Sequence, residues 1–384
     1  MRLLFLPRYG PQGASSRYRI WQYLGLFERA GHEVEVRALL DDSYLRELYS
    51  TGRRPWRWLA SGYARRLLDA LRVGRFDAVI CEQEVLPYLP DFVDLFYQRL
   101  SARFFLDFDD DAHSKYAQWP LLRRRIPRIM AAAETVVVGN NHLARYAQQF
   151  AQRVCVIPTV VDLSCYRDRS NAPPASTVRV AWIGTPLTAG LLRGLIPTMK
   201  KLQSKHSTLS FRFIGAGVGF ACDGLRVETP PWSEKTETEL LLQCDVGIMP
   251  LPDTEFTRSK CGLKLIQYMA CGLPVVASPV GVNQEIVEDG KNGYLASSDD
   301  DWFQRVDLLI RNRELRVSFG KAGRAKVEAG YTLGHGFAKW RQVLEGNEIA
   351  QDRAPGNASV RNAEMRSSDN LATSDREIEV KGPL

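Results

Sequence analysis

Short apolar segments rich in β-branched residues alternate with helical patterns along most of the chain, in two successive series. Apolar runs of this length, joined by segments long enough for a crossover helix, are typical of parallel strands buried on both faces. The sequence therefore predicts an α/β protein with two doubly wound parallel sheets. Helical patterns such as 18–29 and 141–150 fill the connections. The expected strands are 3–6, 34–38, 78–81, 104–108, 135–138 and 154–157, then 178–183, 210–214, 226–228, 246–249, 275–277 and 293–295.

The expected domain boundary lies between the two series. The stretch 168–177 is rich in Pro, Ser and Asn, which suits a linker. A chain of 384 residues is also longer than one ordinary core accommodates. We therefore expect an N-terminal domain over 1–167 and a C-terminal domain over 178–333. A helix at 334–346 is expected to pack back, and the polar segment 347–384 is expected to be a disordered tail.

The cysteines and the apolar segments bear on the cellular compartment. The seven cysteines are odd in number and lack regular spacing, which fits neither a disulfide framework nor a zinc site. We interpret them as reduced thiols of a cytoplasmic protein. The N-terminal apolar run breaks at Pro7 and is too short for a signal peptide. No segment approaches the ~20 apolar residues of a membrane span. The sequence thus predicts a protein that is neither exported nor integral to a membrane.

Positive charge is concentrated in the first part of the chain. Residues 1–160 carry 23 basic and 17 acidic side chains, which accounts for +6 of the net charge of +7. Apolar and aromatic residues are interleaved with the arginines of these clusters. This composition is typical of a protein surface that binds peripherally to an anionic membrane. Nucleic acid is the competing partner, but no nucleic-acid-binding motif supports it, and a solvated arginine-rich face is the structural alternative. The clusters comprise Arg53, Arg54, Arg57, Arg65, Arg66, Arg123, Arg124, Arg125 and Arg128.

The segment from Arg258 to Val287 predicts a helix over 263–270, a Cys-Gly-Leu-Pro turn and a buried strand over 275–277. Such a unit places polar groups at the carboxyl end of a parallel sheet, where α/β proteins bind ligands. Its residues resemble the donor-binding motif of the retaining family 4 glycosyltransferases, which consist of two Rossmann-like domains facing across a cleft (the GT-B fold). The residues in register are Gly262, Met269, Ala270, Gly272, Pro274, Val275, Val276 and Ala277.

Two glutamates of that motif are replaced here by Ser259 and Gln267. In the family the first contacts the donor sugar and the second hydrogen-bonds the ribose. An amide at Gln267 still accepts and donates hydrogen bonds, so Gln267→Glu is expected to be tolerated. Lys260 and Lys264 stand in the same segment, either solvated or offsetting the charge of a donor diphosphate. The resemblance thus implies donor binding by Ser259, Lys260, Gly262, Lys264 and Gln267.

In each series, one glycine-containing loop follows the first strand and precedes a helix. Backbone N–H groups at the start of such a helix can approach anions. The first contains Gly13 and Ser15, and the second contains Gly184 and Thr185. In the resembled family such loops approach the donor diphosphate or the acceptor. These four residues are therefore further candidates for donor binding, although a single glycine loop is also typical of a plain turn.

Carboxylates gather after the predicted strand 104–108, in the sequence Asp-Phe-Asp-Asp-Asp-Ala-His that begins at Asp107. Aspartates so close in sequence repel one another, which favours raised pKa values, cation binding or exposure to solvent. The resembled family often carries a catalytic polar residue at this strand end, so Asp109, Asp110 and His113 are the catalytic candidates. A rival interpretation is the metal-binding D-x-D motif of single-domain glycosyltransferases, at Asp107–Asp109 or Asp109–Asp111.

The resemblance implies a retaining glycosyltransferase that moves a sugar from a nucleotide-diphosphate donor to a glycan, lipid-linked or small-molecule acceptor. It implies no metal and no cofactor, because the nucleotide sugar is a substrate. A different class of function is a non-catalytic nucleotide-sugar-binding or scaffold protein, which the two missing glutamates would explain.

Overall fold

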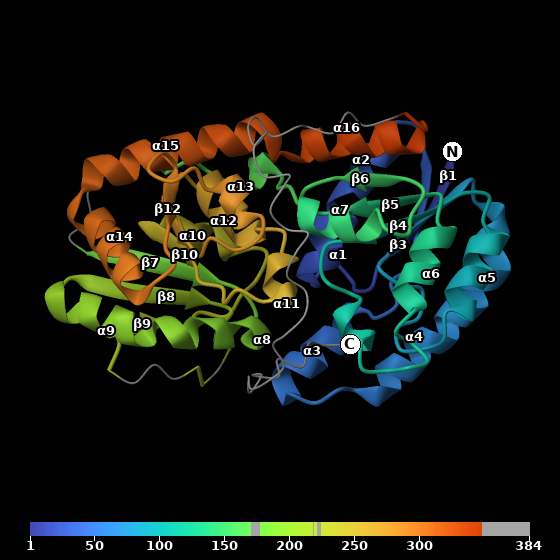
Figure 1. Cartoon of the computed structure of the whole chain (residues 1–384), viewed down its shortest axis with the longest axis horizontal. Coiled ribbons are helices and arrows are strands. Elements are labelled where there is room, and N and C mark those ends of the chain that lie inside the picture. The colour runs from blue at the N-terminus through green and yellow to red at the C-terminus, as the bar shows by residue number, and fades with distance from the viewer. Residues whose placement is uncertain (170–176, 218, 221–223, 348–384) are drawn as a thin grey trace, which may run out of the picture.

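Two parallel sheets of six strands lie side by side in the computed structural model, which describes residues 1–169, 177–217, 219–220 and 224–347 (Figure 1). Their strand orders are β2-β1-β3-β4-β5-β6 and β12-β11-β10-β7-β8-β9. The two predicted sheets are thereby confirmed, and each strand lies within two residues of its predicted bounds. The strands are β1 Arg2–Leu6, β2 Glu33–Val36, β3 Ala78–Glu82, β4 Phe104–Phe108, β5 Thr135–Val138, β6 Val154–Val156, β7 Val178–Ile183, β8 Leu209–Ile214, β9 Val227–Glu228, β10 Val246–Met249, β11 Val275–Ala277 and β12 Gly293–Leu295.

Helices occupy the crossovers between the strands. Around the first sheet they are α1 Ala14–Arg19, α2 Leu24–Arg29, α3 Asp42–Thr51, α4 Trp56–Asp69, α5 Phe92–Leu100, α6 Arg125–Ala132 and α7 Asn141–Ala147, with the 3-10 turns η1 Trp21–Tyr23 and η2 Ala70–Arg75. Around the second they are α8 Pro186–Ala189, α9 Ile196–Lys205, α10 Glu237–Leu242, α11 Glu255–Arg258, α12 Leu263–Ala270, α13 Asn283–Ile286, α14 Asp299–Arg311 and α15 Arg313–Gly330, and then α16 Leu333–Leu344 follows. Among these described helices, none is long and apolar enough to cross a membrane.

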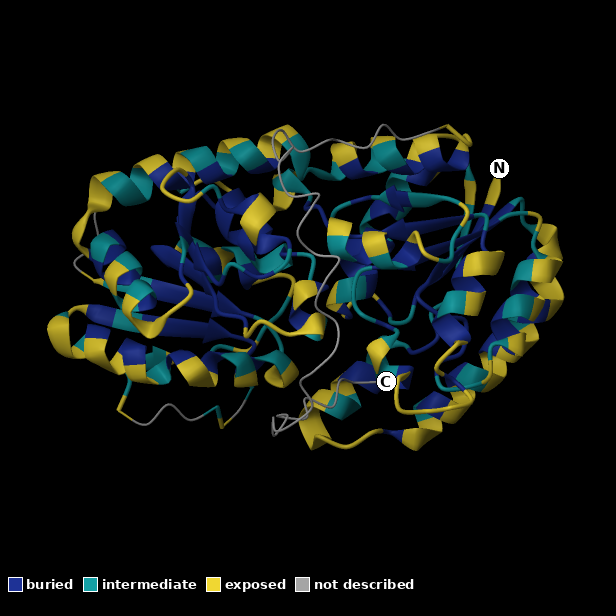
Figure 2. Ribbon diagram, viewed as in Figure 1, coloured by how far each residue is buried: buried dark blue, intermediate teal, exposed yellow. Residues whose placement is uncertain are grey.

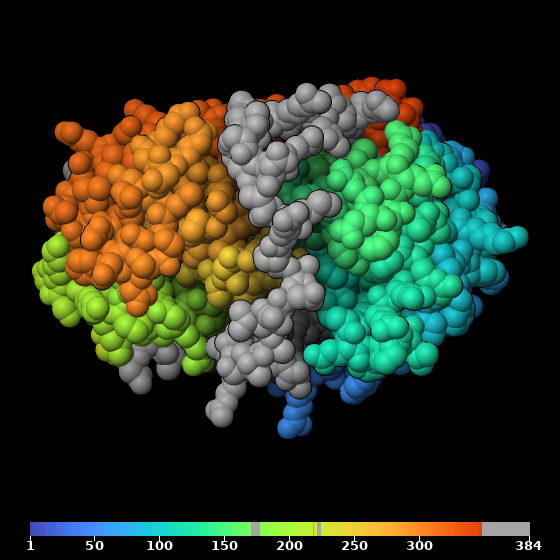
Figure 3. Space-filling view, viewed as in Figure 1, coloured from blue at the N-terminus to red at the C-terminus, as the bar shows by residue number. Residues whose placement is uncertain are grey.

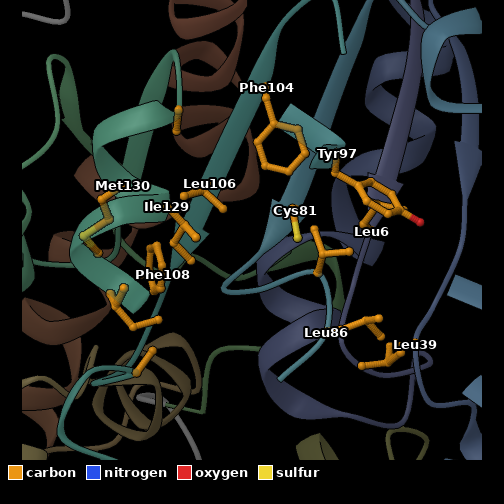
Figure 4. Packing of buried hydrophobic residues seen from close by; sticks show 14 of the residues in the cluster. Leu6, Leu39, Cys81, Leu86, Tyr97, Phe104, Leu106, Phe108, Ile129 and Met130 are labelled. Atoms are coloured by element: carbon orange, nitrogen blue, oxygen red, sulfur yellow. The ribbon is translucent and has the colours of Figure 1, made fainter. Parts of the chain in front are cut away.

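Alternate residues of the first sheet enter two different cores, as the two-residue period of a strand requires. One set of side chains, including Leu6, Cys81 and Leu106, packs against the helices α3 to α7 (Figure 4). The intervening residues, including Phe5 and Phe105, pack on the opposite face with Phe27 of α2. The sheet is therefore covered on both faces, and its polar groups are left for the strand ends.

The second sheet follows the same plan. Ala181, Met249 and Ala277 belong to a core that α12 covers. Trp182, Phe211 and Ile248 belong to a second core under α9 and α14. Figure 3 shows the two sheet units side by side, and α15 leads into α16 from the second unit to the first (Figure 1).

The last described helix, α16, returns to the first sheet. Trp340 and Val343 are buried in the same core as Phe5 and Phe27. A short parallel pairing between Val161 and Thr332 accompanies the return. Most of the expected linker (170–176) and nearly all of the expected tail (348–384) lie outside the described residues, so the expected domain limits stay predictions.

The helix expected over 18–29 is interrupted. Ile20 has φ −129° and ψ −62°, which ends α1 before η1 and α2 begin. Ile20 itself is fully buried in the core beneath the sheet. The break separates α1 from α2. The serines and arginines of α1 therefore lie at the carboxyl ends of β1, β3 and β4.

Candidate active site

The carboxyl ends of β3 and β4 bring Glu82 and Asp109 together with two serines of α1. Ser16 Oγ donates to Glu82 Oε2 at 2.5 Å. Ser15 Oγ lies 2.6 Å from Glu82 Oε1 and 2.6 Å from Asp109 Oδ2. One hydroxyl group has a single proton to donate, so one of the two carboxyl groups carries a proton. Burial, followed by the charge of Asp109, raises the pKa of Glu82 to about 7, and we therefore place the proton on Glu82.

This carboxyl cluster leads to a prediction about stability. The pKa of Glu82 in the folded state lies above its unfolded value, so its contribution is fully present below about pH 4.5 and is lost as the pH rises through about 7. In Glu82→Gln the carboxamide keeps the shape without titrating. We expect the variant's free energy of unfolding to decrease less than that of the wild type between pH 5 and 7. Urea titrations across this range measure the difference, and parallel curves for the two proteins would contradict the assignment.

Asp107 is not available for a D-x-D metal site. Its side chain is fully buried and accepts a hydrogen bond from Arg19 Nε at 2.8 Å and a second hydrogen bond from Arg19 Nη2. Burial raises the pKa of Asp107, and the Arg19 guanidinium opposes that shift. The presence of two Rossmann-like sheets also excludes the single-domain fold in which that motif occurs. In the described part of the chain, no group of three or more His, Cys, Asp or Glu is arranged to hold a metal ion.

Asp110 connects the first sheet to the loop between α11 and α12. Lys260 Nζ lies 2.5 Å from Asp110 Oδ2, and Ser259 Oγ donates to Asp110 Oδ1 at 3.0 Å. Asn140, at the start of α7, donates to the carbonyl oxygen of Ser259 at 2.6 Å. Burial raises the pKa of Asp110, and Lys260 opposes the shift. The candidates Ser259 and Lys260 are therefore occupied by contacts with the facing sheet.

His113 makes its side-chain contacts with Asp111 and Tyr146, not with Asp110 or Lys260. Its Nδ1 is 2.7 Å from Asp111 Oδ1, and its ring stacks on Tyr146 with centroids 3.8 Å apart. Burial would raise the pKa of Asp111, but hydrogen bonds from His113 and Ser114 lower it to about 2. Of the three catalytic candidates, His113 thus has a packing role in this arrangement, and Asp109 is the one beside the shared proton.

Lys264, on the first turn of α12, is a cation without a carboxylate partner. Its Nζ lies 5.6 Å from the centroid of the Trp182 ring, and it makes no hydrogen bond or ion pair to any described residue. Burial, together with the charge of Lys260, lowers its pKa to about 8. Gly262 precedes the helix with φ +68°, and a Cβ there would lie 2.3 Å from Ile286 Cδ1, so glycine is required. The turn therefore presents an ammonium group with unused donors.

Gln267, one turn later on α12, is 3% exposed. Its Nε2 donates to Tyr18 Oη at 3.1 Å and to Tyr166 Oη at 3.2 Å, and it lies 3.3 Å from Glu237 Oε1. Glu237 also accepts from Trp232 Nε1 at 2.6 Å. The amide nitrogen is therefore part of a buried polar cluster that joins α1 to α10 and α12.

The two glycine loops use most of their donors internally. Gly184 N donates to Ile214 O at 3.0 Å, and Thr185 N donates to Thr188 Oγ1 at 3.1 Å. A Cβ on Gly13 would lie 2.4 Å from Tyr9 Cβ, so this glycine is required by packing. Ser15 faces two carboxyl groups, which would repel a diphosphate. The loops thus shape the site, and Lys264 is the donor-side candidate with free hydrogen-bond capacity.

Comparison with known proteins relates the second sheet unit to a family. Residues 179–312 match the model of the family described as Glycosyl transferases group 1. This part of the chain is therefore similar to that family. The match runs from β7 into α14 and includes α12 with Lys264 and Gln267. A D-inositol 3-phosphate glycosyltransferase of Segniliparus rotundus is 26% identical over 248 residues, which cover 56% of this chain and 53% of the relative. The matches span about half or less of the curated relatives.

Solved structures show that the chain has the GT-B fold. Sucrose-phosphate synthase from Thermosynechococcus elongatus superposes with a TM-score of 0.66 at 14% identity, covering 90% of this chain and 98% of that one. Anabaena HepE, in complex with UDP and glucose, superposes with a TM-score of 0.64 at 17% identity, covering 90% and 100%. At these identities the likeness concerns the fold alone.

Sequence reasoning missed several residues of the candidate site. Glu82 reads as the end of an apolar strand, and only the Ser15 hydroxyl group between Glu82 and Asp109 shows that one of the two carboxyl groups carries a proton. Glu237 belongs to a helix 30 positions from Gln267. Its burial among tyrosines depends on α1 of the other sheet. No local pattern signals such contacts.

Proposed function

We propose that the protein is a retaining glycosyltransferase that transfers a sugar from a nucleotide-diphosphate donor, without metal, to a glycan, lipid-linked or small-molecule acceptor. The observation that carries the proposal is Lys264, an ammonium group at the start of α12 that pairs with no described residue and lies within the segment that matches the family. A positively charged group at this place stabilises the charge that develops on a departing diphosphate. HepE, which has the same fold, was solved with UDP and glucose.

The donor lies, in this proposal, against the second sheet. Lys264 contacts the diphosphate beside Trp182, and Gly184 and Thr185 form the wall of the site. Lys260 is held by Asp110, which also accepts a hydrogen bond from Ser259. It therefore approaches the donor only through a rearrangement of the loop before α12. Electrostatic stabilisation by a fixed cation then performs the work that a divalent metal does in other transferases.

The acceptor lies against the first sheet, where Asp109 accepts a hydrogen bond from the reacting hydroxyl group. Ser15 and Glu82 hold the Asp109 carboxylate in place through the short contacts at 2.6 Å. A carboxylate so held is oriented before substrate arrives, which lowers the entropy lost on binding. We assign Ser15 to the acceptor side because its neighbours are carboxyl groups.

A donor screen tests the proposed activity. UDP, GDP and ADP and their sugars are added to the protein, and a ligand of the folded state raises the melting temperature. The matching nucleotide sugar is then incubated without acceptor. Slow release of nucleoside diphosphate, unchanged by EDTA, supports the enzyme. Binding without any release supports a non-catalytic sugar-nucleotide protein, and strict dependence on Mn²⁺ would contradict the metal-free reaction.

We further propose that the first domain docks on an anionic membrane from the cytoplasmic side. Large apolar side chains are exposed on α4, η2 and α5, which pack together on the outer side of the molecule (Figure 2). Leu71 is 82% exposed and Leu121 is 95% exposed. The six described cysteines are free, which fits a reducing compartment. The other exposed apolar residues of α4 and α5 are Trp56, Leu67, Leu68, Phe92 and Phe96, while Leu121 and the exposed Trp119 lie in the segment before α6.

Two of the arginines expected on this surface are instead in the core. Arg66 donates to the carbonyl oxygens of Pro7 and Arg37, and it is 1% exposed. Arg125 is 1% exposed and pairs with Glu84 and Asp94. Buried arginines need such acceptors, so these two serve the fold. The arginines left exposed beside the apolar residues are Arg53, Arg54, Arg57, Arg65, Arg72, Arg75, Arg99, Arg123, Arg124 and Arg128.

Vesicle sedimentation tests the membrane surface. We expect the protein to bind vesicles that contain anionic lipid, and to bind less at high salt. The double variant Leu71→Ser and Leu121→Ser should reduce the partition coefficient about tenfold or more, because each leucine buries apolar area in the lipid. Leu187→Ser, at an exposed position of the other domain, is the matched control. Equal binding by both variants, or binding to duplex DNA but not to vesicles, would contradict the proposal.

A further inference from the structure

A guanidinium group at the carboxyl end of β1 has one whole hydrogen-bonding edge unused. Arg8 Nη1 donates to Gln83 Oε1 at 3.0 Å, and the backbone N of Arg8 donates to Glu82 Oε2 at 2.9 Å. Its Nε and Nη2 atoms are buried and have no hydrogen-bond partner among the described residues. Nε and Nη2 form the edge of an arginine that grips both oxygens of a carboxylate or two oxygens of a phosphate.

Two buried arginines of the chain, Arg19 and Arg212, fill this same edge. Arg19 places Nε and Nη2 on Asp107, and Arg212 places them on Glu228 Oε2 at 2.9 Å and 2.5 Å. Where other described arginines have a buried nitrogen without a partner, it is a single atom and never the Nε–Nη2 pair; these are Arg66, Arg125, Arg169 and Arg179. A buried charged edge without acceptors is unfavourable, so a missing anionic partner is the simplest explanation for Arg8.

One aromatic ring lies beside the guanidinium group, and a second ring stacks on the first. The Arg8 guanidinium lies 5.6 Å from the centroid of the Tyr9 ring, and Tyr9 stacks on Tyr44 with centroids 6.4 Å apart. The hydroxyl group of Tyr44 is also buried without a partner among the described residues. Aromatic walls with a few directed polar groups are typical of binding sites for small organic ligands. The surroundings therefore fit an organic anion better than a bare ion.

Gln83 connects this edge to the candidate catalytic carboxylate. Its Oε1 accepts from Arg8, and its Nε2 donates to Asp109 Oδ1 at 3.3 Å. Gln83 has φ +59°, a conformation that is costly for a residue with a side chain and that persists where the surroundings require it. The nearby charge of Glu84 is neutralised by Lys115 and Arg125. An anion on Arg8 would therefore lie one glutamine away from the reacting group, without a competing free carboxylate at Glu84.

We propose that Arg8 binds an anionic group, a carboxylate or a phosphate, carried by the acceptor, while Tyr9 and Tyr44 line the space around it. The inference deepens the proposed transferase and rests on it for the role of the ligand as acceptor. The anionic group makes two parallel hydrogen bonds to Nε and Nη2, and the acceptor hydroxyl group points towards Asp109. Acceptors without a negative charge leave the Nε–Nη2 edge unpaired, so they bind with lower affinity.

Calorimetric titration with three matched probes tests the site: glucuronate, glucose 6-phosphate and methyl glucoside. We expect one of the two anions to bind the wild-type protein at millimolar concentration at least tenfold more tightly than the neutral glucoside. The anion that binds identifies the group as carboxylate or phosphate. Arg8→Lys keeps the charge but loses the paired geometry, so it should weaken that anion about tenfold and leave the glucoside unchanged. Arg8→Gln should weaken it further.

Nucleotide binding separates this inference from the proposed function. Both Arg8 variants should keep the wild-type affinity for the nucleotide found in the donor screen, which also shows that they fold. If anion binding depends on Arg8 but no donor is turned over, the result supports the anion site and contradicts the proposed transferase activity. The site is overturned if neither anion binds, if the glucoside binds as tightly, if Arg8→Lys changes nothing, or if the variants lose the nucleotide instead.

Discussion

Lys264→Met is expected to lose nucleotide affinity and to gain stability at the same time. In the proposed donor site the ammonium group makes charge-assisted bonds to the diphosphate, so removing it should cost about 1.5–3 kcal/mol, or roughly 10- to 100-fold in the dissociation constant. In the free protein the same group is held charged against burial, as its pKa of about 8 shows. Methionine fills the same volume without that penalty, so the unfolding free energy should rise by about 1–2 kcal/mol.

The effect of Lys264→Met on stability should change with pH, which a change in packing alone would not produce. Because burial lowers the pKa of Lys264, the folded state loses its proton through about pH 8, while the unfolded chain keeps it to about 10.5. The stability of the wild type therefore improves relative to the variant above pH 8. Its nucleotide affinity falls over the same range, because the neutral amine no longer pairs with the diphosphate.

Denaturant titrations and nucleotide calorimetry at pH 7 and pH 9 check both effects. Lys321→Met, on the exposed face of α15, is the matched control and should change neither quantity. Arginine at position 264 should keep the affinity at pH 9, since a guanidinium does not titrate there. If Lys264→Met binds the nucleotide as the wild type does, the donor site lies elsewhere.

Features that depend on local sequence were predictable. The strand Val275–Ala277 and the helix Leu263–Ala270 have the predicted bounds, because apolar runs and a Gly-Leu-Pro turn determine them within a few residues. Both sheets follow from the same pattern repeated. The helix expected over 18–29 failed at Ile20, where the demand for a buried apolar residue in the core overrides the helical periodicity.

The partners of the site residues were not predictable, because they come from distant parts of the chain. Ser259 meets Asp110 across 149 positions, and Gln267 meets Tyr18 across 249. The motif placed Lys264 near the diphosphate, but only the fold shows that Lys260 is paired and Lys264 is not. The unused edge of Arg8 is likewise invisible in the sequence, where it is one arginine among many.

For Gln267→Glu the structure predicts a loss of stability, whereas the sequence alone predicts that the change is tolerated. Restoring the family's glutamate would place a second carboxyl group next to Glu237 Oε1, which lies 3.3 Å from the present amide nitrogen. Two carboxylates cannot both be charged in such a buried site, so the new group must be protonated on folding. We expect a loss of about 2–4 kcal/mol in unfolding free energy at pH 8, as for an unpaired buried charge.

That loss should depend on pH in one direction. The new carboxyl group would have a folded pKa above its unfolded value, so its penalty is absent below the unfolded pKa and grows as the pH rises. Gln284→Glu, at an exposed position of α13, is the matched control and should cost less than about 0.5 kcal/mol. Urea titrations at pH 5 and pH 8 compare the two variants. Suppose that Gln267→Glu is as stable as the control at pH 8. Then the amide does not contact Glu237 in solution, α12 and α1 are not joined there, and Gln267 is free to bind the ribose as the family resemblance implies.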